Sequence, residues 1–463
     1  MEQVNRGGGF WFVSLAALFL AFASWINNSI VGRINTHLFH REVMAVPGWW
    51  LYTAVRTVAT LLIVWAIVRF PKQQVVPLAA RSNKEAGLFF EPLMGLRAMA
   101  CMIVLMGHFF LIYFPYSTSA APAVVQMLLD SSPWAGVWLF FTLSGYLMGK
   151  GFVRARYTLD EAGCRLFYRN RILRIGPIYY VSILVLSVYT CPQIFHWKHA
   201  WILFEMAIFD YRSLPINPNQ ILWSVSTEMQ FYLLAPVMVL FLFYLKEKTG
   251  RGFLLVPLLF LCLGTALRMW IKSHKGNLQM FYLGYSPLVT NLDLFLAGIS
   301  INLVPRIRVS VVVRQWLGPT LFAGSLGFYA LVSWITFYKS NFHMDYEDIQ
   351  ARGQILCCLI ACVLIYVAEL CGRIEIRKSP VSWFLMGLQA MGTLTYCLYV
   401  FHPEVLLVNA DLLPKVHSLD VSLHQFPLVM LETLLMASLF YFFIEKPFDR
   451  IKRVRGTALV DAP

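Results

Sequence analysis

Long apolar runs separated by short polar stretches dominate the sequence. A helix needs about 20 mostly apolar residues to cross a bilayer, and runs of about that length recur along the chain. The predicted spans are 10–26, 49–70, 93–114, 134–153, 174–190, 222–245, 252–270, 280–303, 316–338, 352–371, 382–408 and 423–445. The apolar piece 200–209 is too short to cross and is interpreted as an interfacial or re-entrant segment. The pattern predicts an all-α fold, a polytopic transmembrane helix bundle of about 12 spans.

The loops between the predicted spans differ in charge. Basic residues collect in every second loop and in the tail: 150–174, 246–251, 306–314, 373–378 and the residues after Glu445. The other loops are neutral or acidic, except that Lys272 and Lys275 lie between two spans on the other side. Because lysine and arginine are enriched in cytoplasmic loops, we expect both termini to be cytoplasmic. The same distribution accounts for the net charge of +14 without a nucleic-acid partner.

The composition supports one membrane bundle rather than several soluble domains. Only 13% of the 463 residues are charged and 59% are hydrophobic, whereas soluble domains carry about 25% charged residues. The nine cysteines include no C-x-x-C pair, so neither a disulfide framework nor a metal site is expected. No nucleotide-binding loop or serine-hydrolase motif is present.

A predicted boundary at 71–92 divides the bundle. It separates two leading spans (1–90) from the main transmembrane domain (91–450), which is followed by a basic cytoplasmic tail (451–463). The first span ends in small residues at 21–24, a pattern that resembles a signal-peptide cleavage site. Its weak basic flank and the tryptophan that follows favour a retained anchor.

Arg97 and His108 are polar groups inside the third predicted span. They are eleven positions apart. In an α-helix, eleven residues bring a side chain back to within about 20° of the same face after a rise of about 16 Å along the axis. The structural interpretation is an arginine that extends to the interface and a buried, hydrogen-bonded histidine. The functional interpretation is a site with groups at two depths, because polar groups in a span are costly.

Glu228 is the second such group. It lies in the apolar span 222–245 with Ser226 nearby and with Trp223 and Tyr232 on either side. An intramembrane carboxylate is by default a candidate functional residue, although a glutamate that pairs with an arginine to join two helices is the structural alternative. The two aromatic residues could also serve only in packing.

Two further groups of polar residues stand at span boundaries. Arg171 and Arg174 are three positions apart on one predicted helix face, and guanidinium groups bind phosphates well; ordinary interfacial anchoring is the alternative. Near the C-terminus, Tyr396, Tyr399 and His402 precede Pro403, and of the ten histidines only His108 and His402 lie within apolar spans.

In this order, the motifs resemble those of the acyltransferase 3 family of integral membrane acyltransferases. The matching elements are the Arg97 and His108 pair, LFFTLSGYL (139–147), RILRIGPIYY (171–180), WSVSTEMQFY (223–232), TYCLYVFHP (395–403) and IEKP (444–447). They cover about 91–450, a region that contains ten predicted spans and so agrees with the family's ten-helix core. The two leading spans depart from the family's pattern.

The resemblance implies transfer of an acyl group, commonly acetyl, from cytoplasmic acyl-CoA to a hydroxyl group of a cell-envelope carbohydrate or glycolipid. It implies that His108 is the base, with Glu228 and Arg97 completing the catalytic set, and that Arg171 and Arg174 bind the phosphates of acetyl-CoA. Trp223, Ser226, Tyr396 and His402 are the expected substrate-binding residues, and no metal is expected. The bacterial inner membrane is the expected location.

Family members often carry a further extracytoplasmic domain after the bundle. This chain ends 18 residues after Glu445, so we expect either direct transfer within the bundle or a relay through a separate envelope-synthesis protein. Two other functions remain open: a transporter or flippase of a lipid-linked sugar, which also needs intramembrane charges, and a structural partner protein in which these polar groups only stabilise packing.

Overall fold

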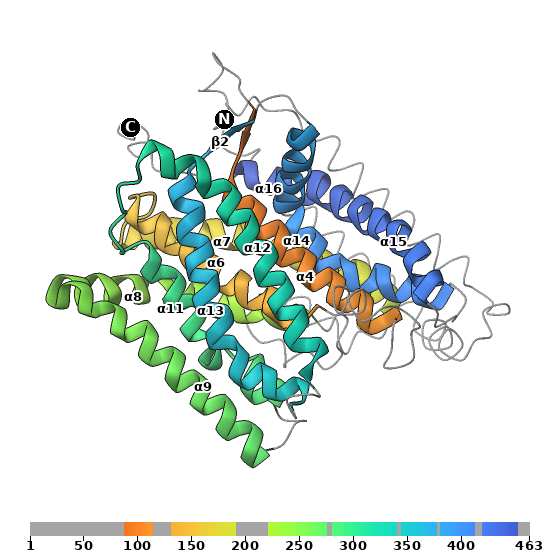
Figure 1. Cartoon of the computed structure of the whole chain (residues 1–463), viewed down its shortest axis with the longest axis horizontal. Helices are drawn as coiled ribbons and strands as arrows, with labels where there is room; N and C mark the ends of the chain where they lie inside the picture. The colour runs from red at the N-terminus through yellow and green to blue at the C-terminus, as the bar shows by residue number, and fades with distance from the viewer. Residues whose placement is uncertain are drawn as a thin grey trace, which may run out of the picture. The chain divides into compact units, whose positions relative to one another are not determined.

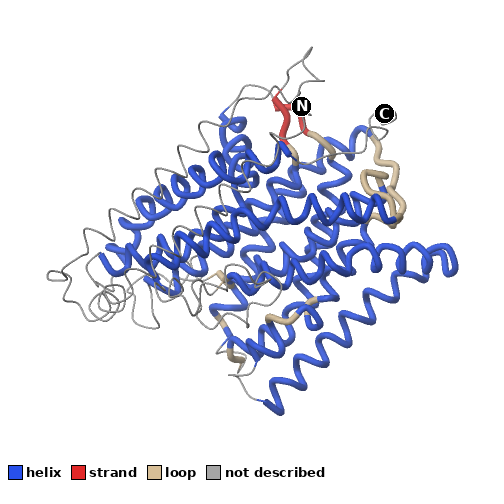
Figure 2. The backbone as a smooth tube through the Cα atoms, turned by 180° about the vertical axis from the view of Figure 1, so that it is seen from behind, coloured by secondary structure: helices blue, strands red, loops and turns tan. Residues whose placement is uncertain are grey.

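The computed structural model describes residues 88–113, 131–190, 221–275, 280–339, 344–376, 380–412 and 419–451. Long helices make up most of this part of the chain (Figures 1 and 2). They are α4 (Pro92–Tyr113), α6 (Pro133–Val153), α7 (Glu161–Thr190), α8 (Leu222–Thr249), α9 (Leu255–Lys275), α12 (Val311–Phe337), α13 (Tyr346–Cys371), α14 (Pro380–Leu412) and α15 (Leu419–Phe440). Shorter helical pieces are η6 (Gly250–Leu254), η7 (Met280–Tyr285), η8 (Leu288–Thr290), α11 (Leu292–Ile301), η10 (Tyr441–Glu445) and α16 (Lys446–Ile451).

The chain divides into two compact units, which are described separately. The first consists of 1–81, 172–226 and 438–452, and the second of 82–171, 227–437 and 453–463. The second unit therefore contains α4, α6, α9 and α11–α14 in full. In this unit α4, α6, α11, α13 and α14 pack around a shared core, in which Trp138, Phe295 and Phe401 are fully buried.

Two short strands that precede α4 and α14 in the chain pair with each other. β1 (Leu88–Phe90) pairs in antiparallel fashion with β2 (Ile374–Ile376), with Phe89 opposite Glu375. β1 precedes α4 in the chain and β2 precedes α14. The two helices run side by side in the same direction (Figure 1), because Glu91 contacts Gln389 and, one turn further along both helices, Met94 contacts Gly392. The prediction of a purely α fold missed this sheet, because a strand of three residues is too short to show an alternating pattern.

Glycines allow the close approach of α6 to α11. A Cβ atom on Gly145 of α6 would collide with the backbone of Phe295 in α11, and one on Gly298 would collide with the carbonyl oxygen of Thr142 in α6. Small residues at such crossings let helix backbones pack closely within membranes. The LSG motif of the sequence therefore positions α6 against α11.

The structure partly confirms the predicted spans. Six segments among the described residues are long and apolar enough to cross a membrane: Pro92–Phe109, Leu222–His274, Val312–Phe337, Tyr346–Cys371, Val381–Leu406 and Phe426–Ile451. The second of these contains both α8 and α9, which separate at Gly250, a residue with a φ of 57°. The predicted spans 10–26 and 49–70 and the short segment 200–209 lie outside the described residues, so the total of about 12 stays a prediction.

The span predicted at 280–303 is wrong as a continuous helix. It consists of the π-helical turn η7, the 3-10 turn η8 and the ten-residue helix α11. Pro287 lies between η7 and η8 and has no amide hydrogen for a helical bond, which explains the break. Hydropathy shows only that the segment is apolar and cannot distinguish a broken helix from an intact one.

Candidate active site

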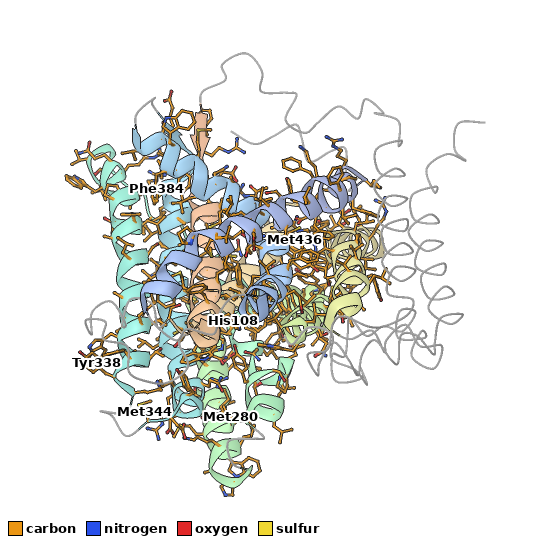
Figure 3. The ribbon with its side chains drawn as sticks, turned by 90° about the vertical axis from the view of Figure 1, so that its right-hand side faces the viewer. His108, Met280, Tyr338, Met344, Phe384 and Met436 are labelled. Atoms are coloured by element: carbon orange, nitrogen blue, oxygen red, sulfur yellow. The ribbon has the colours of Figure 1, made fainter. Side chains whose placement is uncertain are left out.

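The structure brings the two intramembrane histidines together. Nε2 of His402 lies 3.0 Å from Nδ1 of His108, and the ring centroids are 5.0 Å apart. His402 is fully buried and His108 is half-buried. Figure 3 shows His108 on α4 among the surrounding helices. Sequence analysis placed His402 with the substrate-binding residues, whereas its imidazole is hydrogen-bonded to the proposed base.

The parallel packing of α4 and α14 explains this meeting. The backbone amide of Glu91, just before α4, donates a hydrogen bond to Gln389 of α14, and Gly392 of α14 lies against the backbone of Met94 in α4. From that contact, fourteen residues of α4 and ten of α14 lead to the two histidines. A cluster formed by Phe109, Val405, Leu406 and Val429 packs beside the pair.

Glu228 is held by two hydroxyl groups. Ser144 of α6 and Tyr232 of α8 both donate hydrogen bonds to its Oε1. Ser144 belongs to the LFFTLSGYL motif (139–147), and its contact with the carboxylate is a finding of the structure. In the described part of the chain, the side-chain hydrogen-bond partner of His108 is His402, and not Glu228.

Glu228 and His108 also lie at different depths along the helices. Gly107, next to His108, abuts Pro133 at the start of α6, and Gly136 abuts Ala100, so α4 and α6 are antiparallel. Ser144 is eleven residues further along α6 than Pro133, a rise of about 16 Å. Arg97 is eleven residues before His108 on α4, and Ser144 contacts Glu228. Arg97 and Glu228 therefore lie at one depth along the helices, and the histidine pair lies at another.

Arg171 and Arg174 have different surroundings, although they are three residues apart on α7. In the second unit, the Arg171 guanidinium lies over the rings of Phe167 and Tyr232, at 5.8 and 5.7 Å from the centroids. Its Nε is buried without a hydrogen-bond partner among the described residues. Tyr232 thus contacts both Glu228 and Arg171.

In the first unit, Arg174 forms ion pairs with Glu445 and with Asp449, the latter at 3.2 Å. The Glu445 side chain is 1% exposed. Glu445 belongs to the IEKP motif (444–447), and its partner is an arginine 271 residues earlier in the chain. Two carboxylates already compensate the charge of Arg174.

The remaining predicted substrate-binding residues are buried or half-buried. Trp223 and Ser226 are buried in the first unit. Tyr396 is half-buried on α14, six residues or about 1.7 turns before His402.

Sequence analysis missed a buried ionic network at the broken helix. Arg268 of α9 donates hydrogen bonds to Asp293 at 3.3 Å and to the Thr290 carbonyl oxygen, and Gln354 of α13 donates to Asp293 at 2.9 Å. All of these side chains are buried. The available signal was a charged residue inside an apolar span, the same signal that identified Arg97.

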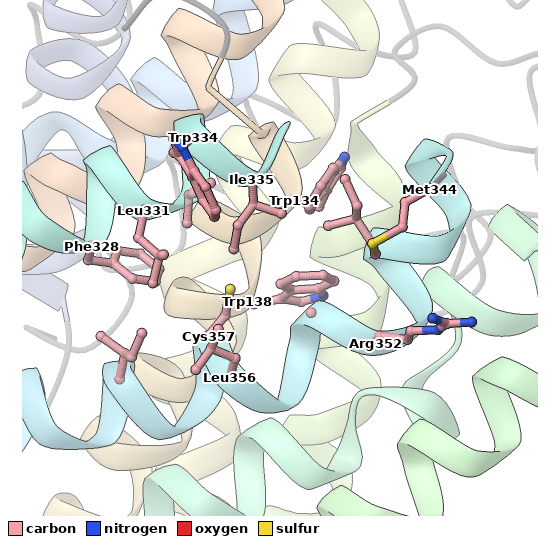
Figure 4. A pocket seen from close by; sticks show the side chains of 14 residues that line it. Trp134, Trp138, Phe328, Leu331, Trp334, Ile335, Met344, Arg352, Leu356 and Cys357 are labelled. Atoms are coloured by element: carbon pink, nitrogen blue, oxygen red, sulfur yellow. The ribbon is translucent and has the colours of Figure 1, made fainter. Parts of the chain in front are cut away.

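An apolar cavity of about 290 Å³ lies elsewhere in the second unit (Figure 4). Its walls come from α6, α12 and α13 and include Trp134, Trp138 and Trp334, with Arg352 also in the lining. None of the predicted site residues lines it. No cluster of three or more His, Cys, Asp or Glu side chains suited to a metal ion occurs within the described ranges.

Comparison with known proteins decides the family. The model of the acyltransferase 3 family, described as an acyltransferase domain, matches residues 93–444. The chain belongs to the acyltransferase 3 family. The match includes His108, Glu228 and His402, and the apolar helices described above fit a membrane protein.

The chain is also similar to curated bacterial proteins. It is 26% identical over 331 residues to the putative peptidoglycan O-acetyltransferase YrhL of Bacillus subtilis (strain 168). The matched region covers 67% of this chain and 50% of that protein. It is also 26% identical over 360 residues to the peptidoglycan O-acetyltransferase OatA of Listeria monocytogenes, a match that covers 72% of this chain and 54% of that protein. The chain thus spans about half the length of these relatives. No solved structure matches it.

Proposed function

We propose that this chain is a membrane-bound O-acyltransferase. It moves an acyl group, most simply acetyl, from acyl-CoA supplied at the cytoplasmic side to a hydroxyl group of a cell-envelope carbohydrate. The observation that carries the proposal is the hydrogen-bonded pair His108–His402 inside two adjacent helices of an acyltransferase domain. Neutral imidazole is the side chain best suited to accept a proton near pH 7.

His108 is the general base in this reaction. It takes the proton of the acceptor hydroxyl as that oxygen attacks the thioester carbonyl carbon. The carbon–sulfur bond then breaks, and the departing sulfur takes the proton from the His108 imidazolium. The products are an ester of the acceptor and CoA with a free thiol, and His108 returns to its neutral form.

The acyl donor enters from the end of the second unit that holds Arg97 and Arg171. These cations suit the phosphates of CoA, and the unpartnered Nε of Arg171 supports this assignment. Arg174 is a weaker candidate, because Glu445 and Asp449 already bind it. Arg97 lies about 16 Å from His108 along α4, so the donor extends inward from the phosphates to the thioester.

The acceptor is a carbohydrate hydroxyl group, and peptidoglycan is the first class to test, since two relatives are named peptidoglycan O-acetyltransferases. Trp223, Ser226 and Tyr396 remain the proposed acceptor contacts, and Glu228 joins either these contacts or the donor site. The proposed location is a bacterial inner membrane with both termini cytoplasmic, where a separate envelope-synthesis protein could receive the acyl group.

The test is acetyl-CoA turnover by the full chain in lipid nanodiscs, followed as release of CoA thiol with and without peptidoglycan fragments. We expect His108→Gln to lower the rate at least about 100-fold, the contribution expected of a general base. His274→Gln is the matched control, because His274 is exposed at the end of α9 and remote in sequence from the pair. Wild-type turnover in the His108 variant would remove the base assignment.

A transporter or flippase is the second candidate. The broken helix η7–η8–α11, with the buried Arg268–Asp293 pair beside it, favours this function, since discontinuous helices line the substrate sites of many transporters. Failure of the purified chain to bind or cleave any acyl-CoA would favour the transporter, whereas acetyl-CoA turnover would exclude a purely structural role.

A further inference from the structure

We propose that His402 is a positioning residue that fixes the tautomer of His108, so that Nε2 of His108 is the atom that accepts the proton. The inference rests on the proposed function insofar as His108 is the base. The tautomer itself follows from hydrogen-bond geometry alone and can be measured without turnover.

Nδ1 of His402 carries the hydrogen of its imidazole. This nitrogen lies 2.8 Å from the carbonyl oxygen of Tyr399 and 3.2 Å from that of Leu398. Carbonyl oxygens only accept hydrogen bonds, so Nδ1 of His402 carries the hydrogen. A neutral imidazole has one N–H group, and Nε2 of His402 therefore has a lone pair.

Pro403 explains why the Tyr399 carbonyl receives this bond. In an α-helix the amide of residue 403 would donate to the carbonyl of residue 399. Proline has no amide hydrogen, so this helical bond is absent and His402, the preceding residue, donates to the same oxygen. The His-Pro sequence of α14 thus determines the orientation and tautomer of His402.

The tautomer of His108 follows from that of His402. Because Nε2 of His402 has only a lone pair to offer, Nδ1 of His108 supplies the hydrogen of the 3.0 Å bond between the rings. Nδ1 of His108 also lies 3.1 Å from the carbonyl oxygen of Val104, a second acceptor. Both contacts place the hydrogen on Nδ1 and leave the lone pair on Nε2, which has no hydrogen-bond partner within the described residues.

His402 then acts when His108 takes a proton at Nε2. The imidazolium that forms keeps its Nδ1–H bond to His402, and this bond becomes charge-assisted and stronger. A carboxylate performs this task in the Ser-His-Asp triad. Here a neutral imidazole performs it, so no unpaired anion is buried beside the base.

Two amide variants separate positioning from simple structural support. In His402→Gln, Oε1 replaces the acceptor Nε2, whereas in His402→Asn the shorter amide reaches the Tyr399 carbonyl but not His108. We expect His402→Asn to lower kcat about 10- to 100-fold, the range for losing one hydrogen bond to a charged group, with KM for acetyl-CoA unchanged. We expect His402→Gln to recover most of the lost kcat. Equal losses in both variants, or a loss confined to KM, would overturn the positioning role.

The tautomer is tested directly by ¹⁵N solid-state NMR of the full chain in nanodiscs with labelled histidine. The His108 signals are those lost in His108→Gln. We expect a protonated Nδ1 and an unprotonated Nε2 for His108 in the resting protein. A hydrogen on Nε2 of His108 overturns the inference, whatever the activity of the chain. Absence of turnover together with the expected tautomer would instead contradict only the proposed function.

Discussion

Ser144 donates a hydrogen bond to Glu228, and this bond joins α6 to α8 within the second unit. Tyr232 donates to the same oxygen. Ser144 lies in the LFFTLSGYL motif, whereas Glu228 and Tyr232 lie in the WSVSTEMQFY motif. Neither motif indicates that the two segments are in contact. Among the described residues, the hydrogen bonds to Glu228 therefore come from hydroxyl groups, whereas the structural alternative for an intramembrane carboxylate was an arginine.

Removal of the Ser144 hydroxyl tests this bond. In Ser144→Ala the carboxylate loses one of two donors, and we expect the free energy of unfolding to fall by about 1.5–3 kcal/mol, since hydrogen bonds to charged groups have this strength. The measurement is thermal unfolding in detergent. Ser273→Ala is the control, because Ser273 is exposed on α9, and its midpoint should not change. A similar fall in both variants would show that the bond contributes nothing specific.

Arg171 tests the donor site. We expect Arg171→Gln to raise KM for acetyl-CoA about tenfold, as loss of one charged contact implies, but to leave KM for S-acetylpantetheine unchanged, because that donor lacks the CoA phosphates. Arg352→Gln, at an exposed position on α13, should affect neither donor. An equal rise for both donors would mean that Arg171 supports the fold through Phe167 and Tyr232.

The carboxylates around Arg174 should differ in importance. Glu445 is buried and Asp449 is 32% exposed, and a broken buried ion pair costs about 3–5 kcal/mol whereas exposed pairs contribute about 0–1 kcal/mol. We expect Glu445→Gln to lower the thermal midpoint by many degrees and Asp449→Asn to change it little. Equal effects of the two substitutions would contradict a buried pair at Arg174.

Two glycines in similar helices should respond in opposite ways to alanine. Gly298→Ala places a Cβ against the backbone of α6, and we expect a loss of about 1–3 kcal/mol from overpacking. Gly327→Ala has no atom within 4 Å of the new Cβ, so the gain in helix propensity of up to about 1 kcal/mol should prevail. Denaturant or thermal unfolding of both proteins measures the difference. A stable Gly298→Ala protein would refute the close approach of α6 and α11.

Sequence pattern predicted several features well. It identified the apolar segments that form α4, α13 and α14, and it singled out His108, Glu228 and His402 as costly polar groups in spans. It also identified the family through six short motifs in order. These properties are local, since a span is recognised by its own hydropathy and a polar residue within it by its own solvation cost.

Other features depend on packing and backbone geometry that hydropathy does not reveal. The broken helix at 280–303 remained apolar throughout, so hydropathy did not reveal the break. Arg268 and Asp293 lie 25 residues apart, and only packing joins them. The sequence also grouped Arg171 with Arg174 by helical spacing, whereas Arg171 lies over Tyr232 and Arg174 pairs with Glu445, two residues from different and distant parts of the chain.

The sequence alone determined that this chain belongs in a membrane, which side chains are too polar for that setting, and which family its motifs resemble. Only the tertiary structure decided which polar groups meet: His108 with His402, Glu228 with Ser144, and Arg174 with Glu445. The physical reason is that apolarity is a property of each segment, whereas pairing depends on the direction and register in which two helices pack. Glycines at helix crossings and the pairing of β1 with β2 contribute to that register. The two histidines that it brings together are 294 residues apart along the chain.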